Sequence, residues 1–485
     1  MGGQSADIGL IGLAVMGENL ALNMERRGFH VAVYNRTSAR VDEFIAGRGR
    51  GRKFIGARTL RELVQALRRP RLIMMMIKAG APVDQQIDQL LPLLERGDIL
   101  IDGGNSLYTD TMRRLERVEA AGMLYVGCGV SGGEEGALTG PSLMPGGSAS
   151  AWPQIRPLLQ AICARTPEGE PCAEWMGAGG AGHFVKMVHN GVEYGDMQLI
   201  GETYGVMKHV LQMSNAQMRD VFDEWNRGEL DSYLIQITRD ILGHVNERGE
   251  AVLDSILDAA GQKGSGKWTV IEALEQGAPL SLVGEAVFAR SLSAAKEERV
   301  AVSKLLTPDV AAFSGEPQGL LDDLRQALYA AKIISYTQGF QLLRAAELRH
   351  GWGLDHSAVA QVWRAGCIIR SAFLADIRAA FQRDSQLVSL LFDDFFRNAV
   401  GVRQAAWRRA VSVAVSAGAP TPCLSSALAW FDSYRMARLP ANLLQAQRDY
   451  FGAHTYERID RPRGEYFHTD WTGRGGATTS GSYSA

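Results

Sequence analysis

The sequence predicts an α/β domain first, a large all-α domain after it, and a short polar tail at the end. Half of the glycines, 27 of 54, lie in the first 180 residues, so turns are concentrated there. Proline is absent between Pro171 and Pro279 and again between Pro317 and Pro420. Because a proline inside a helix costs about 3 kcal/mol, these two stretches favour long helices. A length of 485 residues is compatible with such a division, since domains commonly span roughly 100–200 residues.

Composition and charge exclude several classes of protein. Apolar residues make up 46% and charged residues 21% of the chain, which is typical of folded globular proteins and argues against disorder. The net charge of −2 gives no overall attraction to nucleic acid or to an anionic membrane. A basic segment from Arg48 to Lys53 is short and falls in a predicted loop, so we interpret it as a solvated loop.

The cysteines and the apolar runs indicate the compartment. Five cysteines without a CxxC pair argue against a disulfide framework or a zinc ribbon. No apolar run approaches the roughly 18–20 residues that span a bilayer. The segment from Met1 to Asp7 lacks the basic and apolar regions of a signal peptide. We therefore expect a cytoplasmic protein that contacts neither membrane nor nucleic acid.

Alternating strands and helices are predicted in the first domain. Apolar runs predict strands at Ile8–Val15, Val31–Tyr34, Leu72–Ile77, Ile99–Ile101 and Met123–Val126. Helix-like segments separate them at Glu18–Arg27, Ser38–Ala46, Leu60–Leu67, Val83–Leu94 and Asp110–Ala120. This alternation predicts a parallel sheet with helices on both faces, and the continuous apolar character of the runs fits strands buried on both sides.

The rest of the chain reads as helical until the tail. From His183 to about Arg438 the pattern is helical, with long segments at Gly182–Leu211 and Leu321–Gly351. After Pro440 the chain becomes polar, aromatic and glycine-rich, and we expect this tail to build no core of its own. The predicted domains are therefore residues 1–179, 180–437 and 438–485.

A phosphate-binding turn follows the first predicted strand. Its fingerprint is Gly12-x-Ala14-x-x-Gly17. Gly12 permits a tight turn, Ala14 lets the backbone approach a pyrophosphate, and Gly17 allows close packing of helix on strand. The pyrophosphate would lie at the helix N-terminus, where free amides favour anions. The first domain is thus predicted to be a Rossmann-like dinucleotide-binding domain.

The end of the second strand indicates which dinucleotide binds. An NAD site places Asp or Glu here to hold the ribose hydroxyls. This strand instead ends in Asn35-Arg36-Thr37. Arg36 can pair with a 2′-phosphate, and Thr37 adds a hydroxyl donor. We therefore predict NADP as the cofactor.

One helix carries a polar face in an otherwise apolar segment. Lys186, His189, Asn190 and Glu193 are spaced i, i+3, i+4, i+7, which places them within an arc of roughly 100°. Lys186 and Glu193 are too far apart for an ordinary intrahelical ion pair. Because unpaired buried polar groups are costly, a ligand is a plausible partner. A desolvated lysine and a carboxyl group on one face can act as base and acid.

A metal site on the same helix is the alternative interpretation. It would use His183, His189 and Glu193. His183 and His189 are six residues apart and point to opposite faces of a helix. We therefore predict no metal.

The motifs together resemble the 6-phosphogluconate dehydrogenase family over nearly the whole chain. The resembling segments are Gly12–Asn19, Asn35–Thr37, Asp102–Ser106, Gly129–Glu134, Gly140–Gly147, Gly182–Gly191, Glu193–Gln198, Gly261–Trp268 and Arg448–Thr455. The helix motif and the tail motif are specific to this family, whereas the first fingerprint is shared with other dehydrogenases.

The resemblance implies a reaction. 6-Phosphogluconate and NADP would give ribulose 5-phosphate, carbon dioxide and NADPH, with Lys186 as general base and acid and Glu193 as general acid. Lys186 would take the proton of the C3 hydroxyl and then polarise the new ketone, and Glu193 would protonate the enediol. Such a decarboxylation needs no metal, only a proton donor or cation at the developing enolate oxygen.

The resemblance also implies binding residues for substrate and cofactor. For the substrate these are Asn105, Ser131, Gly132, Gly133, His189, Asn190, Tyr194, Lys263, Ser265 and Arg290, with Arg448 and His454 reaching in from the tail of a partner subunit. For the cofactor they are Gly12, Ala14, Met16, Gly17, Asn35, Arg36, Thr37, Lys78 and Asn105. A homodimer with shared active sites follows. Ser265 stands where the family has threonine, which keeps the hydroxyl group.

Two other functions stay open. A non-decarboxylating 3-hydroxyacid dehydrogenase would not need Glu193 as an acid and would lack the phosphate-binding residues Lys263, Arg290 and Arg448. A catalytically dead NADP-binding scaffold would be expected to lose Lys186 or Glu193. Both residues are present.

Overall fold

The computed structural model describes residues 5–262, 264–306, 309–310, 312–475 and 479–480. Two compact units divide the chain, Met1–Ala427 and Leu428–Ala485. In the part of the chain that is described, no helix combines the length and the apolar character needed to cross a membrane.

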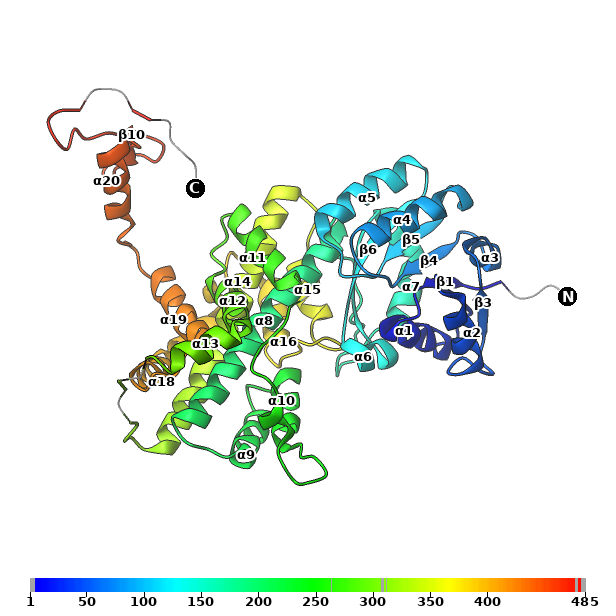
Figure 1. Cartoon of the computed structure of the whole chain (residues 1–485). Helices are drawn as coiled ribbons and strands as arrows, with labels where there is room; N and C mark the ends of the chain where they lie inside the picture. The colour runs from blue at the N-terminus through cyan, green and yellow to red at the C-terminus, as the bar shows by residue number, and fades with distance from the viewer. Residues whose placement is uncertain (1–4, 263, 307–308, 311, 476–478, 481–485) are drawn as a thin grey trace. The chain divides into compact units, whose positions relative to one another are not determined.

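An eight-stranded sheet forms the first part of the larger unit (Figure 1). Its strand order is β3-β2-β1-β4-β5-β6-β7-β8. The strands are β1 (Ile8–Ile11), β2 (Val31–Tyr34), β3 (Phe54–Ala57), β4 (Leu72–Met75), β5 (Ile99–Asp102), β6 (Leu124–Ser131), β7 (Ser142–Gly147) and β8 (Gly177–Ala178). The prediction of a parallel sheet is confirmed except for the pair β6 and β7, which is antiparallel. Residues 132–141 join these two strands, too few for the crossover that a parallel pair needs.

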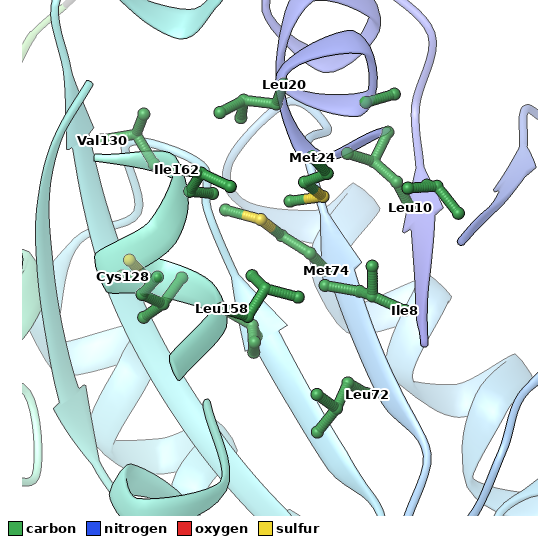
Figure 2. Close-up of a cluster of buried hydrophobic side chains, with 14 of the residues drawn as sticks. Ile8, Leu10, Leu20, Met24, Leu72, Met74, Cys128, Val130, Leu158 and Ile162 are labelled. Carbon is green, nitrogen blue, oxygen red and sulfur yellow. The ribbon is translucent and has the colours of Figure 1, made fainter. Parts of the chain in front are cut away.

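Helices cover both faces of the sheet, as predicted. They are α1 (Val15–Arg26), α2 (Ser38–Ala46), α3 (Leu60–Ala66), α4 (Ala81–Leu90), α5 (Tyr108–Ala120), α6 (Gly133–Thr139) and α7 (Trp152–Ile162). Figure 2 shows one face, where Ile8 and Met74 of the sheet pack against Met24 of α1 and Leu158 of α7. On the other face the core includes Ile73, with residues of α3, α4 and α5. Successive residues of a strand supply both cores, which explains runs that are apolar throughout.

Strands β3, β7 and β8 are not among the predicted ones. β3 is only partly buried and contains Gly56, so it shows no continuous apolar run. β7 contains Pro145 and ends in two glycines, residues that normally argue against a strand. β8 has only two residues. These three strands are held in the sheet by their neighbours, which a local pattern does not reveal.

Helices make up most of the remaining part of the larger unit. They are α8 (Ala181–His209), α9 (Asn215–Trp225), α10 (Tyr233–Gly243), α11 (Ser265–Glu275), α12 (Ser281–Ala294), α13 (Lys296–Ser303), α14 (Pro317–His350), α15 (His356–Val362), α16 (Leu374–Arg383), α17 (Asp394–Gly401), α18 (Gln404–Ser416) and α19 (Pro422–Tyr434), which crosses into the second unit. The two long helices predicted from the proline-free stretches correspond to α8 and α14, with ends shifted by a few residues. The exact domain boundaries stay predictions.

Helix α8 connects the sheet to the helices. Its residues contact β6 and β7 and also α11, α12 and α14 (Figure 1). A glycine makes the contact with β6 possible, because a Cβ atom at Gly129 would lie 2.4 Å from the Cβ of Lys186. The helix that carries the predicted base therefore lies directly on the sheet.

The second unit is ordered around a polar group. It contains α20 (Ala441–Gly452) and the antiparallel strands β9 (Tyr456–Glu457) and β10 (Tyr466–Phe467). The fully buried carboxylate of Asp449 accepts hydrogen bonds from the backbone amides of Thr455 and Thr469, from His468 and from Trp471. Large apolar side chains of α20 are exposed, namely Leu443, Leu444, Tyr450 and Phe451. The tail thus has local order, built on hydrogen bonds around a carboxylate.

Candidate active site

The predicted cofactor residues lie where several strands end. β1, β2, β4, β5 and β6 run parallel, so their carboxyl ends meet at one edge of the sheet. Gly12, Asn35, Lys78 and Asn105 follow β1, β2, β4 and β5, and Ser131 is the last residue of β6. Ligands of open α/β sheets bind at this edge.

A cavity of about 430 Å³ lies at the ends of β1, β2 and β4. Six predicted cofactor residues line it, namely Gly12, Ala14, Asn35, Arg36, Thr37 and Lys78. Met16, Gly17 and Asn105 are not among its lining residues. Gly17 instead serves packing, because a Cβ atom there would lie 1.8 Å from the carbonyl oxygen of Gly12.

The turn after β1 has the geometry of a pyrophosphate site. Gly12 has a φ of +103°, and a Cβ atom there would lie 2.4 Å from the carbonyl oxygen of Met76. The amide of Leu13 donates a hydrogen bond of 3.1 Å to Oδ1 of Asn35, which ties the turn to the end of β2. Ala14 is the N-cap of α1 and has no side-chain acceptor. The first amides of α1 are therefore available to an anion.

The charge of this cavity fits a phosphate group. Arg36, Arg40 and Lys78 line it, and the described lining residues include no acidic side chain. Arg40 is not among the predicted residues, although its position four residues after Arg36 at the start of α2 is a usable signal. Nη1 of Arg40 also donates a hydrogen bond to the carbonyl oxygen of Leu13. The residues present fit a dinucleotide that carries an additional phosphate.

The four polar residues of α8 face one another and the end of β6. Nδ1 of His189 lies 3.4 Å from Nζ of Lys186 and 3.7 Å from Oε2 of Glu193. Nε2 of the same ring lies 3.1 Å from Oγ of Ser131. On the other side of the stripe, Nδ2 of Asn190 donates a hydrogen bond of 2.9 Å to Oγ of Ser265 on α11. The structure thus brings all four residues together with Ser131 and Ser265, two residues predicted to bind the substrate.

Burial sets the protonation of this group. Lys186 is only 6% exposed, and desolvation lowers the pKa of its ammonium group, against the opposing charge of Glu193. Desolvation raises the pKa of Glu193, although Lys186 and Arg290 act in the other direction. Desolvation and the Lys186 charge hold the pKa of His189 well below its usual value. A neutral lysine and a protonated carboxyl group become accessible together, as a base and an acid require.

Four other predicted substrate residues, Tyr194, Arg290, Gly132 and Gly133, lie next to members of this group. The guanidinium Cζ of Arg290 lies 3.5 Å from the centre of the Tyr194 ring, a cation–π arrangement. Gly132 and Gly133 directly follow Ser131 and form the start of α6. Both residues have positive φ. Lys263 lies outside the described residues.

Arg448 and His454 belong to the second unit. Nη1 of Arg448 donates a hydrogen bond to Oε1 of Gln445, and Nδ1 of His454 lies 2.9 Å from Oγ of Ser480. Arg448 lies in α20, and His454 lies two residues after the end of that helix.

A buried ion pair beside the polar face was not predicted. Nζ of Lys332 on α14 lies 2.8 Å from Oδ2 of Asp196, and the hydroxyl group of Tyr336 donates to the same oxygen. Asp196 is on α8, three residues after Glu193, within one of the matched motifs. Lys332 is 136 residues away in sequence, so no local pattern could pair it with Asp196.

The histidines of α8 point in different directions. His183 contacts Oγ1 of Thr111 through Nδ1 at 2.6 Å, whereas His189 contacts Ser131 and Lys186. Among the described residues, no group of three or more His, Cys, Asp or Glu side chains could hold a metal ion.

The fold and the site define a class of enzyme. A dinucleotide-binding sheet, a helical part, and a buried lysine with a carboxyl group at the junction are the features of a nicotinamide-dependent dehydrogenase that acts on a hydroxyacid. The model of the 6-phosphogluconate dehydrogenase C-terminal domain matches residues 182–471, and the model of the NAD binding domain of that enzyme matches residues 7–177. The chain belongs to the 6-phosphogluconate dehydrogenase family.

Individual relatives agree over their full length. The decarboxylating 6-phosphogluconate dehydrogenase of Mus musculus is 56% identical over 481 residues, and that of Treponema pallidum is 56% identical over 485 residues. Each alignment covers 99% of both chains. A solved structure of the Plasmodium falciparum enzyme, described as apo and in complexes with NADP+ and with 6-phosphogluconate, matches with a TM-score of 0.92 at 42% identity. That match covers 96% of this chain and 100% of the other.

Proposed function

We propose that this protein oxidises and decarboxylates 6-phospho-D-gluconate to D-ribulose 5-phosphate and carbon dioxide, with reduction of NADP to NADPH. The observation that carries the proposal is the polar face of α8. It holds Lys186 and Glu193 within reach of a single histidine, beside Ser131 and Ser265. The full-length relatives that bear the name of this decarboxylating enzyme support it.

The oxidation step uses Lys186 as a base. NADP, when bound, supplies the hydride acceptor, and Gly12, Ala14, Arg36 and Lys78 would hold it. Neutral Lys186 takes the proton of the C3 hydroxyl group while hydride leaves C3. The C–H bonding pair departs with the hydride, and the O–H pair becomes the second bond of the ketone. Burial lowers the pKa of Lys186, which favours its neutral form before this step.

The decarboxylation step uses the same lysine as an acid. The bond between C2 and the carboxylate breaks, and its electron pair moves toward the ketone oxygen. Protonated Lys186 returns its proton to that oxygen, which yields a neutral enediol and carbon dioxide. A positioned proton donor at the developing oxyanion is the main requirement of such a step.

The last step uses Glu193 as an acid. Glu193 donates its proton to the carbon that becomes C1 of the product, and Lys186 accepts the proton of the enediol hydroxyl group. The cycle then ends with a charged lysine and an ionised carboxyl group. Because Nδ1 of His189 is near both groups, its position supports the return of one proton from Lys186 to Glu193.

The test is a turnover assay with two readouts. Protein, NADP and 6-phosphogluconate are mixed, and NADPH absorbance and released carbon dioxide are followed together. Equal amounts of both products are expected, and unphosphorylated gluconate serves as the control substrate. Failure to form NADPH would contradict the proposal, and NADPH without carbon dioxide would favour a non-decarboxylating 3-hydroxyacid dehydrogenase.

The choice of NADP is expected to depend on Arg36. The Arg36→Ala variant removes the partner proposed for the 2′-phosphate, so kcat/KM for NADP should fall about 10- to 100-fold, as loss of a charge-assisted hydrogen bond implies. The value for NAD should change little. Arg50→Ala is the matched control, because Arg50 is also exposed on the α/β part but does not line the cavity. An equal loss with NAD and NADP would contradict this assignment.

We also infer a homodimer with shared active sites in the cytoplasm. The exposed apolar side chains of α20 support a partner surface, and the tail would bring Arg448 and His454 to the phosphate in the other subunit. Five free, buried cysteines support a reducing compartment. We also propose that the domains meet between residues 179 and 180 and between residues 437 and 438.

A further inference from the structure

One arginine joins two loops at the edge of the sheet where the cofactor cavity lies. Arg114 on α5 has no exposed surface. Its Nε and Nη2 donate hydrogen bonds of 3.0 and 2.8 Å to the carboxylate of Asp84 on α4. Nη2 also donates to the carbonyl oxygen of Gly80, the N-cap of α4, at 3.0 Å. Arg114 therefore fixes the start of α4 and the end of the loop that contains Lys78.

The same guanidinium group also reaches the loop after β5. Nη1 of Arg114 donates to Oγ of Ser106 at 3.3 Å and lies 3.5 Å from Oδ2 of Asp102. The Asp102 carboxylate in turn accepts hydrogen bonds from the amide of Gly104 and the hydroxyl group of Ser106. Asn105 is the exposed residue of this loop, and its neighbours at 102–104 and 106 are buried. A network of buried hydrogen bonds thus fixes the loop conformation in which Asn105 is exposed.

We propose that Arg114 is a positioning residue for catalysis, which holds the Asn105 loop in register with the loop of Lys78 and with α4. The inference rests on the proposed function, in which Lys78 lies along the cofactor and Asn105 contacts both cofactor and substrate. A planar guanidinium group suits this task, because it bonds several acceptors in fixed directions, which an ammonium group does not. Arg114 itself touches neither ligand, since it is fully buried.

A second buried arginine offers a matched comparison at the opposite ends of the same two strands. Arg71 directly precedes β4 and is 8% exposed. Its Nη1 and its amide both donate to the carboxylate of Asp98, which directly precedes β5, at 2.8 and 2.7 Å. Both arginines therefore tie β4 to β5 or to the segments that follow them. Of the two, only Arg114 lies at the edge of the sheet that carries the residues predicted to bind ligands.

The experiment compares Arg114→Lys with Arg71→Lys. We expect both substitutions to lower the Tm, whereas only Arg114→Lys should lower kcat, by about 10- to 100-fold, as a small misplacement of reacting groups does. Its affinity for NADPH, measured by calorimetry without turnover, should also be weaker than that of Arg71→Lys. Equal losses of kcat in the two variants would overturn the inference.

A double-mutant cycle tests whether Arg114 acts through Asn105. In an Asn105→Ala background, Arg114→Lys is expected to lower kcat by a smaller factor than in the unaltered protein, because one of the two groups that Arg114 positions is gone and only Lys78 remains. Losses that multiply would overturn the inference. If the unaltered protein fails to turn over 6-phosphogluconate, the proposed function fails separately. NADPH affinity then decides on Arg114: an affinity of Arg114→Lys equal to that of Arg71→Lys would reject the inference, and a weaker one would support it.

Discussion

The Lys186→Met variant is expected to lose NADPH formation by about 10²- to 10⁴-fold, the usual contribution of a general base. Methionine keeps the length of the side chain but cannot take the proton of the C3 hydroxyl group. The measurement is kcat for NADPH formation, with affinities for NADP and 6-phosphogluconate measured in parallel. Lys186→Arg is the matched variant, because it keeps a cation that stays protonated in proteins. If the arginine variant retained most of the activity, Lys186 would serve as a cation only.

The same variant has an expected effect on stability with a defined sign. In the folded protein, burial lowers the pKa of Lys186, whereas the lysine of the unfolded chain stays protonated at neutral pH. A cation whose pKa is lower in the folded state destabilises the fold at every pH below its ordinary pKa, so Lys186 destabilises the fold at neutral pH. Lys186→Met should raise the Tm there, and the gain should shrink as the pH rises toward the ordinary lysine pKa. A lower Tm at neutral pH would contradict the destabilising role of the buried lysine.

The Glu193→Gln variant is expected to lose overall turnover by about 10²-fold or more, because glutamine cannot donate the final proton. Oxidation of the substrate should be affected less, so a first turnover of NADPH should remain detectable by rapid mixing. In D₂O the unaltered enzyme should place deuterium at C1 of ribulose 5-phosphate with a single stereochemistry. The variant should lose that stereochemical control. An unimpaired Glu193→Gln enzyme would remove Glu193 as the acid.

The pH profile provides an independent check on both residues. The active pair holds one proton, so kcat/KM should fall at low pH, where both groups are protonated, and at high pH, where both are deprotonated. Burial lowers the pKa of Lys186 and raises that of Glu193, so the two limbs should be closer together than for a lysine and a glutamate in water. Glu193→Gln should lose the limb that belongs to the carboxyl group. An unchanged profile would contradict the assignment.

Local patterns account for the parts of the fold that depend on neighbours in sequence. The buried strands β1, β2, β4 and β5 are continuous apolar runs, and the proline-free stretches contain α8 and α14. The polar stripe of α8 is predictable for the same reason, because helix geometry alone places Lys186, His189, Asn190 and Glu193 on one face.

Long-range contacts account for what the sequence does not predict. β7 contains Pro145 and two glycines, yet it pairs along its whole length with β6. Lys332 and Asp196 meet only because α14 packs on α8. Arg114 looks like an ordinary member of a charged surface helix, since α5 has many polar residues. Its burial and its partners on α4 follow from the packing of two crossovers against the sheet.

The two buried arginines lie at opposite ends of β4 and β5, where stability and catalysis place different requirements on the sequence. Arg71 and Asp98 close the amino ends of β4 and β5, whereas Lys78 and Asn105 follow the carboxyl ends of these strands. Arg114 closes the other edge, where it contacts Asp84 of α4 and Asp102, which precedes the loop of Asn105. To raise the Tm, the ion pair of Arg71 and Asp98 can therefore be replaced by apolar residues without changing the edge that carries Lys78 and Asn105. At the Arg114 edge the same replacements would trade activity for stability.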